Sequence, residues 1–80
     1  MANELIKQYD KQPSEKQRDA MSRAFRNMAL YHLLAGDTVI LQTSDYYGDS
    51  SLLASLLVNG QVVLSRKVGM NGGLTVLGNN

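Results

Sequence analysis

The spacing of the apolar residues changes at Gly36, and this change decides the class of fold. Between residues 15 and 35 apolar side chains recur every three or four positions, which is the period of an amphipathic helix. After Gly36 the chain consists of short runs rich in leucine and β-branched residues, separated by turn residues, and such runs are typical of strands. The sequence therefore predicts an α+β fold in which one long helix packs on a small antiparallel β-meander.

The long helix has a signal at each end. Ser14 precedes the periodic run and Gln17 follows three residues later, which is the pattern of a capping box. Gly36 suits the position just after a helix, where the left-handed conformation is common. We expect one helix over residues 15–35.

The N-terminal segment also has helical spacing. Leu5, Ile6 and Tyr9 lie at positions i, i+1 and i+4 among polar residues, and Pro13 would end the run. We therefore expect a short N-terminal helix over residues 2–12.

Residues 38–77 predict three to four antiparallel strands in the same single domain, 1–80. Asn59-Gly60 lies between two apolar runs and is a strong hairpin signal, because a type I′ turn needs positive φ at both central positions. A helix over residues 51–59 is the alternative, since leucine and alanine favour helix. The β-branched run that follows the turn favours the hairpin.

Both faces of this predicted hairpin are apolar. If Val58 pairs with Gln61, one face carries Leu53, Leu57, Val62 and Leu64, and the other carries Leu52, Ala54, Leu56, Val58 and Val63. One helix covers one face of a small sheet, so the second face needs a cover from the N-terminal helix or from another copy of the chain. A chain of 80 residues without cysteine has no disulfides to stabilise it. We expect a homo-oligomer, with a dimer favoured.

The composition is that of a globular protein without a strong charge preference. Hydrophobic residues make up 44% and charged residues 19%, and the net charge is +1. This balance argues against an acidic DNA mimic and against a protein that mainly binds phosphates. The start is polar and the longest apolar run, residues 28–35, is too short to cross a bilayer. We expect no membrane association and a cytoplasmic location, in a bacterial host if the protein is phage-encoded.

The sequence offers no recognisable catalytic or metal-binding motif. The single histidine, His32, lies on the apolar stripe of the long helix, where a structural role is expected. No serine or acid stands at a spacing that would complete a triad. The glycine-rich stretches lack a phosphate-loop motif, and the two aspartates near residue 47 lack the spacing of a calcium loop. We therefore predict no enzyme activity, no cofactor and no metal.

The loop over residues 44–50 is the predicted contact surface for a protein partner. Exposed tyrosines are good contact residues because they bring a large contact area with few rotatable bonds. The second candidate surface is the basic side of the long helix. The predicted partner-binding residues are Asp45, Tyr46, Tyr47, Asp49, Arg23 and Arg26.

The sequence favours a non-enzymatic interaction protein that binds a protein partner and self-associates. Its size and its lack of catalytic motifs are typical of phage or mobile-element accessory proteins that act as inhibitors of host machinery. One alternative is weak nucleic-acid binding through basic residues, namely Arg18, Arg23, Arg26, Arg66 and Lys67. Another is a small-ligand or catalytic site built across an oligomer interface, where His32 or the two aspartates of neighbouring copies would meet.

Overall fold

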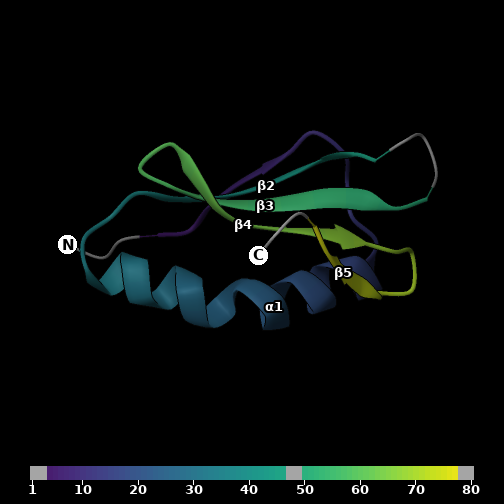
Figure 1. Ribbon diagram of the computed structural model, residues 1–80, viewed down its shortest axis with the longest axis horizontal. Helices are drawn as coiled ribbons and strands as arrows, with labels where there is room; N and C mark the ends of the chain where they lie inside the picture. The colour runs from purple at the N-terminus through teal and green to yellow at the C-terminus, as the bar shows by residue number, and fades with distance from the viewer. Residues whose placement is uncertain (1–3, 47–49, 78–80) are drawn as a thin grey trace.

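One helix lies against one face of a five-stranded sheet (Figure 1). The computed structural model describes residues 4–46 and 50–77. In chain order the elements are β1 (Ile6–Tyr9), α1 (Glu15–Leu34), β2 (Val39–Asp45), β3 (Leu52–Val58), β4 (Gln61–Val68) and β5 (Leu74–Val76). The strands are arranged in the order β1-β2-β3-β4-β5. The predicted α+β class is therefore confirmed.

The N-terminal segment is an edge strand, so the short helix predicted over residues 2–12 is wrong. β1 pairs in parallel with β2, with Ile6 opposite Ile40 and Tyr9 opposite Thr43. A helix this short makes few internal hydrogen bonds and is marginal alone. The pairing instead satisfies backbone groups along the edge of β2 that would otherwise be unpaired. The sheet is consequently mixed, with β1 added to an antiparallel meander that runs from β2 to β5.

The long helix begins as predicted. The Ser14 hydroxyl accepts a hydrogen bond from the Gln17 backbone N–H at 3.1 Å, and the Gln17 side-chain oxygen accepts one from the Ser14 N–H at 2.8 Å. This reciprocal pair is the capping box. The helix ends at Leu34, one residue earlier than expected, and Gly36 follows with φ of 89°.

The β3–β4 hairpin confirms the strand interpretation of residues 51–59. Asn59 and Gly60 both have positive φ, 51° and 86°, as a type I′ turn requires, and Val58 pairs with Gln61. The register shifts between Leu56 and Leu57. Across this shift Leu56 faces Leu64 and Leu57 faces Val62, so Val63 is an extra residue in β4.

This bulge corrects the predicted facing of β4. Because one residue is added, Leu64 lies on the same face as Leu56 rather than with Leu57 and Val62. Leu64 packs against the core, as a residue on the helix-facing side should.

The core lies between α1 and the sheet. Met21 and Phe25 of the helix are 1% and 2% exposed and pack with residues of β2, β3 and β4. The side-chain amide of Gln17, also buried, donates to the carbonyls of Ser50 at 3.1 Å and Val68 at 3.2 Å. The first turn of the helix is thereby bonded to Ser50, two residues before β3, and to the last residue of β4.

In the described parts of the chain, no helix covers the other face of the sheet, which we call the open face. Directly paired residues share a face. The register therefore assigns twelve paired residues to the open face: Ile6, Gln8, Ile40, Gln42, Ser44, Leu53, Ser55, Leu57, Val62, Ser65, Lys67 and Thr75. Residues 6–9 do not cover this face, because they form β1 of the sheet. Among the described residues, no helix is long and apolar enough to span a bilayer.

Candidate interaction site

The open face carries an apolar row that crosses four strands. Ile6, Ile40, Leu57 and Val62 are paired in sequence from β1 to β4. Ile6 is 45% exposed and Val62 is 59% exposed, while the two central residues are half-buried by their neighbours. The next row, Gln8, Gln42, Ser55 and Ser65, is polar and uncharged. The apolar row is therefore bordered by groups that form hydrogen bonds without charge repulsion.

The third row of the open face lies next to Tyr46 of the predicted contact loop. It contains Leu53 and Lys67, which pair with each other. The Lys67 ammonium lies 5.2 Å from the centre of the Tyr46 ring, a cation–π contact. Tyr46 is half-buried and extends the open face beyond the end of β2.

Asp45, the other described residue among the partner contacts predicted in this loop, is exposed and forms an ion pair. Asp45 is the last residue of β2, and its carboxylate lies 2.7 Å from the Lys11 ammonium. Lys11 also donates to the Ser51 carbonyl at 3.0 Å. Asp45 thus helps to join the β1–α1 connection to the start of β3. Tyr47 and Asp49 lie outside the described residues.

The structure separates the two predicted helix contacts. Arg23 and Arg26 are both exposed on α1, but Arg26 borders a pocket between the helix and β1 and Arg23 does not. The basic residues of the nucleic-acid alternative are also divided. Arg66 lies on the helix-facing side of β4 and donates to the Ser65 carbonyl at 2.7 Å, whereas Lys67 lies on the open face. Lys67 therefore lies on the opposite face of the sheet from Arg66 and from the arginines of α1.

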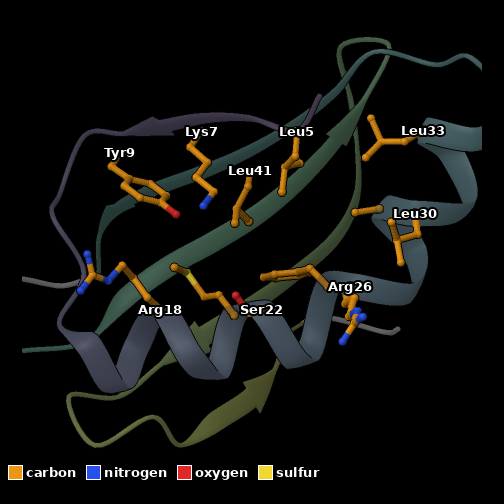
Figure 2. Close-up of a pocket in the computed structure, with 12 residues that line it drawn as sticks. Leu5, Lys7, Tyr9, Arg18, Ser22, Arg26, Leu30, Leu33 and Leu41 are labelled. Atoms are coloured by element: carbon orange, nitrogen blue, oxygen red, sulfur yellow. The ribbon is translucent and has the colours of Figure 1, made fainter. Parts of the chain in front are cut away.

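The pocket beside Arg26 was not predicted from the sequence. It has a volume of about 410 Å³ and lies between β1 and α1 (Figure 2). β1 contributes alternate residues, Lys7 and Tyr9, after Leu5. The two-residue spacing of Leu5, Lys7 and Tyr9 fits a strand, but Leu5 and Tyr9 are also four residues apart, which fits a helix. The sequence spacing therefore does not reveal the pocket wall.

His32 belongs to a hydrogen-bonded cluster at the far end of α1. Its Nδ1 lies 3.0 Å from an Asp37 carboxylate oxygen, and the other oxygen accepts from the Asn59 side-chain amide at 3.1 Å. These hydrogen bonds from His32 and Asn59 hold the pKa of the Asp37 carboxyl below its ordinary value. The Asn59 side chain in turn accepts from the Thr38 N–H at 3.0 Å. The cluster joins the helix end to the β3–β4 turn.

This cluster accounts for His32 as a structural residue. In residues 4–46 and 50–77, no group of three or more histidine, aspartate or glutamate side chains could hold a metal ion.

The chain matches no protein-family model. Comparisons with curated proteins and with solved structures also gave no match.

Proposed function

We propose that this chain is a non-enzymatic interaction protein that self-associates through the open face, as a dimer in the simplest case. The observation that supports this most directly is the apolar row of Ile6, Ile40, Leu57 and Val62. A contiguous apolar strip on a sheet face is a common interaction surface, because covering it removes apolar area from water.

A second copy of the chain suits this face. Two identical faces related by a two-fold axis place the same rows against each other, and sheets pack face to face at a spacing of about 10 Å. Of the paired residues on the open face, Lys67 is the single charged one. Two copies of the apolar row therefore meet without bringing like charges to the centre of the interface.

The position of Tyr46 adds a rim to the proposed interface. Its ring lies beside Lys67 in the third row of the open face, so Tyr46 lies at the end of the face, with the polar row between this end and the apolar row. A different protein partner, such as the host target of a phage or mobile-element inhibitor, would first meet this rim.

Sedimentation velocity on a Val62→Lys variant tests the proposal. Val62 is exposed, so lysine at this position should leave the fold intact, and it should convert the dimer to a monomer by placing two charges in the interface. The matched control is Leu34→Lys, since Leu34 is 87% exposed on the helix and should not affect assembly. A monomeric wild-type protein at about 100 μM, a concentration at which a functional dimer should assemble, would contradict the proposal.

A further inference from the structure

The pocket between β1 and α1 has one polar end and one apolar end. Tyr9 and Lys7 reach over it from β1, and Arg18 lies at the same end on the first turns of the helix (Figure 2). Leu30 and Leu33 lie at the opposite end. Met21, Phe25, Ala29 and Leu41 add further apolar lining. Arg26 lies one helical turn before Leu30, so two cations lie at the polar end and a third borders the apolar end.

The charge around the pocket has one sign. Lys7, Arg18 and Arg26 all line it, and no aspartate or glutamate does. Within the described residues, none of these three cations takes part in an ion pair. An anionic group bound in the pocket would therefore meet cations that have no carboxylate of the described residues within ion-pair distance.

Tyr9 adds a neutral hydrogen-bond donor at the polar end. Burial raises the pKa of its phenol, and the nearby Arg18 charge opposes this effect. The phenol therefore stays protonated at neutral pH. A hydroxyl beside two cationic side chains is a suitable arrangement for binding a carboxylate.

We propose that this pocket binds a small amphiphile with one anionic group, such as a medium-chain carboxylate. The anionic group lies between Lys7 and Arg18, and the hydrocarbon chain runs along α1 towards Leu30 and Leu33. This site is separate from the open face, and its function does not depend on self-association.

The size of the pocket favours a small ligand over a peptide helix. Small-molecule pockets have volumes of roughly 300–1,000 Å³, and this pocket falls in that range. A pocket of this volume can enclose most of a small ligand, whereas a peptide helix would lay only one face into it.

Calorimetric titration with hexanoate, octanoate and decanoate, each kept below its micelle concentration, tests the proposal. Each added CH₂ group that is buried should raise the affinity about fourfold. Octylammonium and octanol test the charge requirement, and both should bind at least about tenfold more weakly than octanoate. Binding of octylammonium as tight as that of octanoate would overturn the proposal, as would no decanoate binding.

Two variants place the ligand in the pocket. The double variant Lys7→Gln, Arg18→Gln should weaken decanoate binding by about tenfold or more, because it removes both charges at the polar end. The control Arg23→Gln removes one charge from the exposed helix outside the pocket and should bind decanoate like the wild type. Circular dichroism confirms that each variant is folded, and equal affinity in the double variant and the control would refute the site.

Vesicles distinguish a free ligand from a membrane surface. We expect the protein to bind vesicles that contain anionic lipids no more tightly than it binds monomeric decanoate. Binding to such vesicles without binding to monomeric decanoate would overturn it. The Val62→Lys variant should bind decanoate with the affinity of the wild type. A failure of the self-association proposal is therefore distinguishable from a failure of the ligand-binding proposal.

Discussion

Gln17 is the residue that joins the start of the helix to the sheet. Its side-chain oxygen accepts from Ser14, and its amide nitrogen donates to the carbonyls of Ser50 and Val68. The capping box was predictable because both of its residues lie within one helical turn. The two bonds to the strands were not, because their partners lie far along the chain and no local pattern marks them.

Replacing Gln17 with glutamate should destabilise the protein by about 2–3 kcal/mol. The change substitutes an oxygen for the amide nitrogen, so two buried carbonyls lose their donor and face a carboxylate. Urea unfolding measures the difference. The control Gln12→Glu makes the same chemical change at an exposed position, and a similar loss in both variants would contradict this role for Gln17.

Asp37 should make stability depend on acid pH. Because the folded pKa of Asp37 is lowered, the stabilisation is fully present above the ordinary value of 3.8 and is lost as the pH falls through the folded value. The stability difference between wild type and Asp37→Asn should therefore shrink between about pH 5 and pH 2. Thermal unfolding of both proteins across this pH range measures the stability difference. Asp19→Asn, on the exposed side of the helix, is the control, and a pH-independent difference for Asp37→Asn would refute the expectation.

Local signals predict the long helix and the hairpin correctly, but the local spacing of residues 5–9 fits both a helix and a strand and predicts the wrong one. The ends of α1 and the Asn59-Gly60 turn were predictable because each depends on neighbouring residues. β1 exists through its pairing with β2, and roughly 30 residues of chain lie between the two. The bulge at Val63 was also missed, because it becomes visible only when β4 is aligned with β3.

The β4–β5 turn should not tolerate a side chain at Gly72. Its φ is 87°, and a Cβ there would lie 3.0 Å from the Lys16 backbone carbonyl oxygen. Gly72→Ala should therefore destabilise the protein by about 1–3 kcal/mol. Gly73→Ala is the matched control, because a Cβ at Gly73 meets nothing within 4 Å. Equal urea midpoints for the two variants would show that the turn adapts without cost.

In the complete fold, β1 contributes residues to both candidate sites, the open face and the pocket. Its outward residue Ile6 starts the apolar row of the open face, whereas Lys7 and Tyr9 form a wall of the pocket. The uncovered sheet face was foreseeable from the apolar residues on both sides of the hairpin. The pocket was not, because it depends on a strand that sequence spacing assigned to a helix.

The pairing of β1 with β2 also has a kinetic consequence. The hairpin of β3 and β4 closes a loop of two residues, but β1 can dock only after the intervening helix has formed and returned the chain to β2. We therefore expect β1 to join the sheet later than the β3–β4 hairpin forms. Detachment of β1 would remove a wall of the pocket and one end of the apolar row together, so a compound in the pocket or a second copy on the open face should each oppose this local opening.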